Sequence, residues 1–348
     1  MNSFSRNLLV TLLIVLAASP PSMSQLVNGR IISSMYSWER FDTVNVSNRL
    51  TRGFLSAILD VAQDDFSLHT HLQGAATGGK SVGDGEVRTF YLYGTLKNLG
   101  DVVDLSLGRI PIFAGVGNGT IDGARVVTYF AENTVRATFY GGANVPTDLT
   151  LKGWGPLKNN YTVGGQVHTS AIENARVGIS YIKRVRELDA YWALRADSLF
   201  NPVQVYITPD PRKVQLGSLD ASYRIGEVFA YGRYDYDADN KKTQRGQLSV
   251  QVSVTDDIAL AADYIHRAPR LPFNSFFSVF EVSTIDEVEG GVDVLLFPRV
   301  RSYLRGAYVQ YEGDNSFRYT IGVATDYASV SYRGNTGYAG ELSSITVQ

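Results

Sequence analysis

The sequence predicts an all-β chain of antiparallel strands, and three observations support this. Apolar and polar residues alternate over segments of about eight to ten residues, which is the period of a strand with two different faces. Turn-forming residues separate these segments, as at Asp84-Gly85 and Asn98-Leu99-Gly100. No segment after residue 24 keeps the three-and-four apolar spacing of an amphipathic helix, so helices are expected to be minor.

The clearest alternation lies in residues 247–254, where Leu248, Val250 and Val252 share one face and the intervening Gln and Ser residues share the other. Residues 317–324 repeat this pattern. A strand with its turn takes roughly 18 to 20 residues, so the length predicts about 16 to 18 strands. The other predicted strands, in chain order, are residues 30–40, 54–61, 66–73, 87–96, 102–110, 125–130, 135–141, 161–169, 177–181, 189–197, 214–224, 228–236, 258–264, 288–296, 301–311, 328–332 and 338–347.

The N-terminus is predicted to be a signal peptide, residues 1–24. Arg6 supplies a positive start, residues 8–18 are uncharged and almost wholly apolar, and small residues precede Gln25. The alternative is a membrane anchor, but the apolar run is much shorter than the ~20 residues that span a bilayer as a helix. The rest of the chain, residues 25–348, shows no linker or repeat and is predicted to form one domain.

The composition excludes several classes of protein. The chain has no cysteine, which rules out a disulfide scaffold, a thiolate zinc site and an iron-sulfur cluster. Its 32 Lys and Arg residues against 34 Asp and Glu residues give a net charge of -2, without the basic excess of a nucleic-acid-binding protein. No cofactor and no nucleic-acid partner are therefore expected, and no motif indicates an enzyme.

Aromatic residues lie near the ends of several apolar strand faces, namely Tyr161, Tyr181, Tyr264, Phe317 and Tyr332. Tyr and Trp favour the boundary between membrane and water, where the ring and its polar group are both accommodated. With its leader, its lack of cysteine and its two-faced strands, the chain resembles a bacterial outer-membrane β-barrel of the porin type. The resemblance implies a closed antiparallel transmembrane β-barrel of about 16–18 strands, with an aqueous lumen and passive diffusion of small hydrophilic solutes.

Two alternatives remain open at this stage. The barrel could be closed to solutes and act as an outer-membrane scaffold or surface-binding protein, with its long loops as the functional part. A secreted soluble β-sandwich or propeller also alternates, so alternation alone does not decide which face is dry. The expected partners of the barrel are outer-membrane lipid and small hydrophilic solutes, and a homo-oligomer is left open.

The polar faces supply the candidate site residues. Charges of both signs alternate with the apolar positions, which predicts a wet face with weak ion selectivity. The Gly-rich residues 111–123 are predicted to be either a constriction loop folded into the lumen, with Phe113, Asn118 and Asp122 as its candidates, or an ordinary surface loop. The lumen-lining candidates are Arg136, His168, Arg195, Arg233, Asp235, Asp263, Glu289, Asp293 and Arg318.

Three histidines invite chemical interpretations with less support. His69 and His71 share one strand face and could share a metal ion, but the sequence identifies no third ligand. His168 lies near Ser170 and Glu173, yet no nucleophile motif accompanies them. A polar wet face accounts for all three, and no catalytic or metal site is predicted.

Overall fold

The structure is a computed structural model that describes residues 26–41, 47–78, 85–151, 156–188, 190–196, 198, 200–269 and 284–348. The predicted leader, residues 1–24, lies outside the described residues. Apart from one short 3-10 helix, η1 (Leu157–Asn159), the regular elements of the described part are all strands. They are β1 (Leu26–Phe41), β2 (Ser47–Gln63), β3 (Phe66–Gly78), β4 (Glu86–Leu99), β5 (Val103–Ala114), β6 (Gly117–Phe130), β7 (Val135–Asn144), β8 (Tyr161–Thr169), β9 (Ala175–Arg186), β10 (Tyr191–Ala196), β11 (Pro202–Ile207), β12 (Arg212–Ile225), β13 (Val228–Asp237), β14 (Lys242–Ser253), β15 (Ile258–Arg267), β16 (Ile285–Phe297), β17 (Val300–Gln310), β18 (Asn315–Thr325), β19 (Ser329–Gly337) and β20 (Leu342–Val347).

Eighteen of these strands form one antiparallel sheet, at the upper end of the predicted range. Each strand pairs with the next strand along the chain, with one exception: β9 pairs with β12. The exception arises because β10 and β11 pair with each other as a separate two-stranded hairpin. Residues 189–197, predicted as a strand of the main sheet, therefore contribute β10 to this hairpin instead. The all-β prediction is confirmed.

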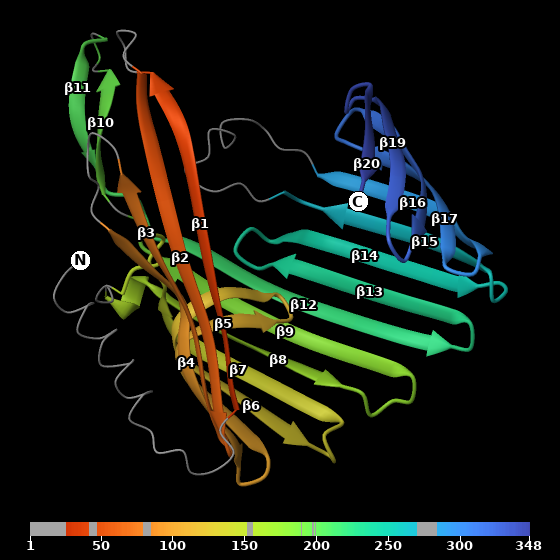
Figure 1. The fold of residues 1–348 in the computed structure, drawn as a ribbon, viewed down its shortest axis with the longest axis horizontal. Helices are drawn as coiled ribbons and strands as arrows, with labels where there is room; N and C mark the ends of the chain where they lie inside the picture. The colour runs from red at the N-terminus through yellow and green to blue at the C-terminus, as the bar shows by residue number, and fades with distance from the viewer. Residues whose placement is uncertain are drawn as a thin grey trace.

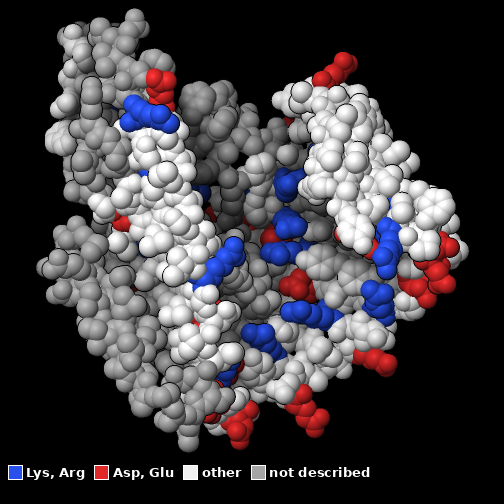
Figure 2. Space-filling model, in the orientation of Figure 1, with Lys and Arg blue, Asp and Glu red and all other residues white. Residues whose placement is uncertain are grey.

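The predicted closure of the sheet is not observed. Among the described residues β1 pairs only with β2, and β20 pairs only with β19, so both remain edge strands. The sheet is curved, with β1 and β2 on one side of the opening and β19 and β20 on the other (Figure 1). The space-filling view shows a hollow between these two sides (Figure 2). The last strand has 6 residues and the first has 16, so little of the long first edge could be matched by the last strand. The described sheet is thus curved and open.

The two faces of the sheet differ sharply. One row of neighbouring side chains that runs across β14 to β18 shows this difference. Leu248, Tyr264, Val288, Tyr308 and Phe317 are direct neighbours in the pairing register. Each of these side chains is between 42% and 57% exposed. A soluble protein buries such a face, because apolar surface in water is costly at about 25 cal/mol per Å². The apolar face of this sheet is turned outward.

The next row along the same strands is polar. Ser249, Asp263, Glu289, Ala307 and Arg318 are neighbours in the register and lie on the opposite face. Basic and acidic side chains gather in the hollow, whereas the walls beside it are mostly uncharged (Figure 2). This arrangement is the reverse of a soluble β-sandwich, and it counts against that alternative. Within the described ranges, no helix is long and apolar enough to cross a membrane.

Candidate functional site

Residues 111–123, predicted as a loop, form the end of a β-hairpin. β5 and β6 pair continuously from Val103 opposite Thr128 to Ala114 opposite Gly117. Only Gly115 and Val116 remain as the turn, and Gly115 has a φ of +59°, which glycine adopts without strain. The high glycine content favoured a loop, but the apolar alternation of this segment continues to the turn. The loop prediction is therefore wrong in its local structure.

The hairpin tip, defined here as residues 110–120, leaves the plane of the main sheet. In the described part β4 pairs with β5 only as far as Arg109, and β7 pairs with β6 only from Ile121 onward. The tip therefore has no strand beside it on either edge. Pro111 is tolerated in β5 for this reason, because its missing N–H falls where no neighbouring strand requires a donor.

Three glycines in register mark the place where the hairpin leaves the sheet. Gly108 lies opposite Gly123, and Gly123 lies opposite Gly142 on the next strand. Gly108 has a φ of +126°, and a Cβ on any of the three would collide with the neighbouring backbone. Glycine in a strand permits such close approach and a sharp bend. The sequence thus directs the tip away from the sheet at this row.

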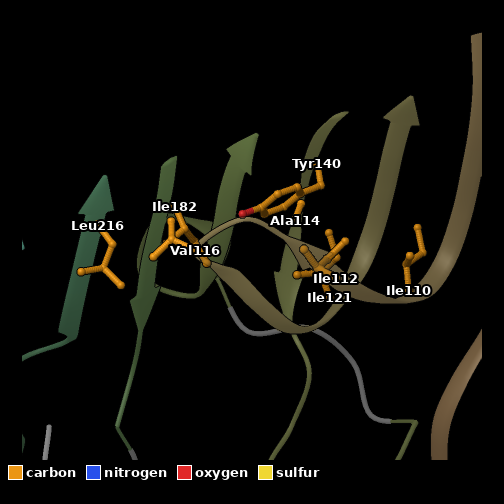
Figure 3. Packing of buried hydrophobic residues seen from close by; sticks show 8 residues of the cluster. All are labelled: Ile110, Ile112, Ala114, Val116, Ile121, Tyr140, Ile182 and Leu216. Atoms are coloured by element: carbon orange, nitrogen blue, oxygen red, sulfur yellow. The ribbon is translucent and has the colours of Figure 1, made fainter. Parts of the chain in front are cut away.

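The tip packs against the polar face of β7, β9 and β12, inside the hollow. Its apolar side chains join Tyr140, Ile182 and Leu216 in a buried cluster (Figure 3). The backbone N–H of Val116 donates to Ser180 Oγ at 2.9 Å, and Arg184 donates to the carbonyl oxygen of Asn118. The hairpin tip therefore lies on the polar face of the sheet and not in an ordinary surface loop.

The three candidates in this segment have different surroundings. Phe113 alternates with the buried Ile112 and Ala114, and its side chain is 84% exposed on the side away from the cluster. Asn118 is also exposed. Asp122 lies at the base of the hairpin, outside the tip, where it faces Arg109. Phe113 and Asn118 are thus exposed, whereas Asp122 has a structural partner.

Arg109 fixes the base of the hairpin and was missed by the sequence analysis. Its Nε and Nη2 atoms donate to the two carboxylate oxygens of Asp122 at 2.7 and 2.9 Å. The remaining guanidinium hydrogens reach the carbonyl oxygens of Thr89, Leu149 and Thr150 at 3.0 to 3.2 Å. The pair is buried, with side-chain exposures of 2% for Arg109 and 9% for Asp122. Charged pairs of this bidentate geometry are strong and directional, so the hairpin is held in one position.

The predicted lumen-lining residues fall on the polar face, with one exception. Arg136, His168 and Arg233 belong to a single row that runs through β7, β8, β9, β12 and β13. Asp263, Glu289 and Arg318 share the row described above, and Asp235 and Asp293 occupy the same face. Arg195 lies outside the main sheet, in β10.

Most of these charges on β13 to β18 are paired. Arg233 binds Asp235 at 2.8 Å, and Arg318 binds Glu289 at 2.6 Å and also Glu287. Asp293 accepts a hydrogen bond from Arg305 at 2.5 Å. Pairs of opposite sign leave little net charge on this part of the polar face.

The histidines are bound in separate networks. His69 contacts Asp60 through Nδ1 at 2.7 Å and Ser67 through Nε2 at 3.0 Å, whereas His71 contacts Ser56. The described ranges hold no group of three side chains arranged to bind a metal ion. These contacts of His69 and His71 cross-link β2 and β3 within the polar face. Ser170, the serine close to His168 in the sequence, donates its hydroxyl hydrogen to the carbonyl oxygen of Thr134 at 3.4 Å.

No family model matches the sequence, and no curated protein does. Solved structures do match. The match to a variant of the Rh. blastica porin covers 93% of this chain and 98% of the porin chain, with 12% sequence identity and a TM-score of 0.40. A triple variant of the Rhodopseudomonas blastica porin has the same coverage and identity and a TM-score of 0.39.

The chain is similar to porins over almost its whole length.

Proposed function

We propose that the protein is a porin-like channel of the bacterial outer membrane, through which small hydrophilic solutes diffuse passively. The observation that carries the proposal is the reversed polarity of the sheet. Its apolar face is exposed outward, as lipid requires, and its charged face surrounds a hollow. The hairpin tip lies within that hollow and supplies the constriction. Export through a leader at residues 1–24 is part of this proposal and remains a prediction.

A membrane-spanning sheet needs closed edges, because lipid offers no partner to a backbone N–H or C=O. We therefore propose that β20 pairs in the membrane with the part of β1 that its 6 residues can match. The strand number is even, at 18, so in a sheet where every neighbour is antiparallel the first and last strands are antiparallel to each other. Both edges also carry exposed apolar side chains on the outward face, such as Ile31 and Ile345. Closure would give these side chains the same lipid environment as the rest of that face.

If the sheet closes in the membrane, cysteines introduced into β1 and β20 are expected to form a disulfide. The chain has no cysteine, so an introduced pair has no competitor. Combining Ile345→Cys with Gly29→Cys, Ile31→Cys or Ser33→Cys samples three registers on the outward face. One combination is expected to form an intramolecular disulfide in membranes, since a disulfide requires Cβ atoms about 4 Å apart. The readout is faster migration on a non-reducing gel, and the single variant Ile345→Cys is the control. Failure of all three pairs to cross-link would argue against closure.

Conductance tests the channel itself. The folded protein in a planar bilayer is expected to give discrete conductance steps. Replacing residues 111–120 by Asn-Gly would join the directly paired Ile110 and Ile121 through a two-residue turn and remove the tip. This variant is expected to give larger steps, because the hairpin no longer occupies the hollow. Steps of unchanged size would show that the tip is not a constriction.

The same experiment separates the channel from a closed scaffold. The packed hairpin is the observation that favours the scaffold, since it could fill the hollow completely. A scaffold would show no steps with the intact chain and steps only after the tip is removed. Recovery of the protein without detergent on cell fractionation would instead place it among secreted soluble proteins.

A further inference from the structure

The β10–β11 hairpin stands apart from the main sheet, at the upper left of Figure 1. Tyr191 and Ile207 pair at its base. Each lies five residues from the end pair of β9 and β12, Arg186 and Arg212, which we call the rim. Five residues of fully extended chain span at most about 18 Å, so the base of the hairpin stays within that distance of the rim.

The surface of this hairpin is apolar and exposed. Only Arg195 and Asp197 carry charge in the sequence from 191 to 207. Six large apolar side chains of the two strands are between 39% and 71% exposed, namely Tyr191, Trp192, Leu194, Val203, Val205 and Tyr206. A hairpin of two strands is marginally stable by itself in water, and an apolar patch of this kind marks a contact with a protein or a membrane. The hairpin is therefore expected to have a cover.

The two faces of the hairpin differ. Side chains alternate along a strand, so Trp192, Leu194 and Tyr206 share one face, which we call the aromatic face. Their exposures are 67%, 71% and 55%, and the rings of Trp192 and Tyr206 lie 5.0 Å apart between centroids. The opposite face carries the exposed Arg195 together with Val205. The hairpin thus has an apolar side with two amphipathic rings and a side with a charge.

The boundary of the membrane is expected near the rim. Tyr181 lies on the outward face of β9 and is 40% exposed, and Lys183 follows on the same face, two residues nearer the rim. Tyrosine and lysine are typical anchors at the boundary between membrane and water. Under the proposed function, lipid therefore ends close to the rim, within reach of the hairpin.

Lipid also fits the aromatic face better than the hollow does. Trp and Tyr favour the membrane boundary, because the ring and its polar group are both accommodated there. A hairpin turned over the hollow would instead place the aromatic face toward the charged side chains that gather there (Figure 2). Its apolar surface would then remain in contact with water, which is unfavourable.

We propose that the β10–β11 hairpin lies on the membrane surface, with Trp192, Leu194 and Tyr206 inserted into the lipid and Arg195 turned toward water. The inference rests on the proposed function, because lipid adjoins the rim only if the sheet spans a membrane. An amphipathic segment at a membrane surface buries its apolar face about 5–10 Å into the boundary between headgroups and acyl chains. The hairpin adds such a contact outside the spanning strands and leaves the mouth of the hollow uncovered.

Tryptophan fluorescence tests the position of the hairpin. The chain has three tryptophans, so Trp38→Phe combined with Trp154→Phe leaves Trp192 as the single reporter. The full chain is refolded into phosphatidylcholine vesicles whose acyl chains carry bromine near the headgroup. At a depth of about 5–10 Å, bromine is expected to lower the emission of Trp192 about twofold relative to the same lipid without bromine. Iodide in the water is expected to have little effect.

Two reporters on β14 calibrate the quenching. In the chain with all three tryptophans replaced by Phe, Leu248→Trp lies on the outward face and Ser249→Trp on the polar face. Bromine is expected to quench the first and iodide the second. A response of Trp192 like that of Ser249→Trp would place the hairpin in water, and protection from both quenchers would show a cover of protein. Either result would overturn the inference.

A second pair of reporters tests which face of the hairpin meets lipid. Tyr206→Trp and Val205→Trp, in the same tryptophan-free chain, are adjacent residues on opposite faces. Since only the aromatic face is buried about 5–10 Å deep, bromine is expected to quench Tyr206→Trp about twofold more than Val205→Trp. Equal quenching of the two would contradict a hairpin that lies with one face on lipid.

The Leu248→Trp reporter separates this inference from the proposed function. Quenching of Leu248→Trp by bromine without quenching of Trp192 would refute the position of the hairpin and leave the channel standing. Quenching of Trp192 without quenching of Leu248→Trp would show a chain bound at the membrane surface through its hairpin. That result would refute the spanning sheet and leave the lipid contact of the hairpin standing.

Discussion

Replacing Arg109 by Met is expected to lower the free energy of unfolding by about 3–5 kcal/mol, the range observed when one partner of a buried ion pair is removed. The substitution leaves the carboxylate of Asp122 buried without its bidentate partner. It also removes the donors to the carbonyl oxygens of Thr89, Leu149 and Thr150. Met fills a similar volume, so the loss reflects the missing charge and hydrogen bonds and not a cavity.

The measurement is urea unfolding of the protein in detergent micelles, followed by tryptophan fluorescence. Arg305→Met is the matched control, because Arg305 and Asp293 form an ion pair with side-chain exposures of 23% and 37%. Solvent screening should limit that loss to about 0–1 kcal/mol. The double variant Arg109→Met with Asp122→Leu should recover part of the stability, since it also removes the buried carboxylate that has lost its bidentate partner. A loss for Arg109→Met no larger than that for Arg305→Met would contradict the anchoring role.

The Arg109–Asp122 pair shows what the sequence could have revealed about the hairpin. A tight turn centred between Gly115 and Val116 places Arg109 directly opposite Asp122, because both are equally distant from the centre. Opposite charges arranged symmetrically about a glycine turn are a signal of hairpin pairing. The glycine content outweighed this signal and suggested a loop. The carbonyl acceptors of Arg109 come from distant parts of the chain, and no local pattern indicates them.

Other parts of the fold were predictable because they depend on local periodicity alone. The alternation in residues 247–254 and 317–324 is found in β14 and β18, with apolar side chains on one face. The position of Arg186 directly opposite Arg212 could not be predicted in this way. It arises because β12 pairs with β9, and the hairpin of β10 and β11 is inserted between them in the chain. The alternation of apolar and polar residues in β9 and β12 does not indicate which strand each of them pairs with.

Val250→Arg is expected to destabilise the protein by about 2–4 kcal/mol in lipid, the cost of a charged side chain at the midplane of the lipid face. Val250 lies between Leu248 and Val252 on the outward face of β14, so the arginine has apolar side chains on both sides. Ser249→Arg, one residue away, points into the hollow. There it lies directly opposite Asp263, and an ion pair at this position contributes about 0.2–1 kcal/mol. Each variant adds one arginine, at adjacent positions of the same strand, and the two arginines lie on opposite faces of the sheet.

Urea titration of the two variants refolded in lipid vesicles measures the difference. Ser249→Arg is a sharper control than Thr320→Arg on β18, because Thr320 lies between Arg305 and Arg333 in the register and a third arginine would meet repulsion on the polar face. A deficit confined to Val250→Arg would establish that the outward face contacts lipid. Equal stability of the two variants would mean that both faces meet water. Something other than lipid would then have to cover the exposed apolar rows. The proposal that this chain lies in a membrane would be contradicted.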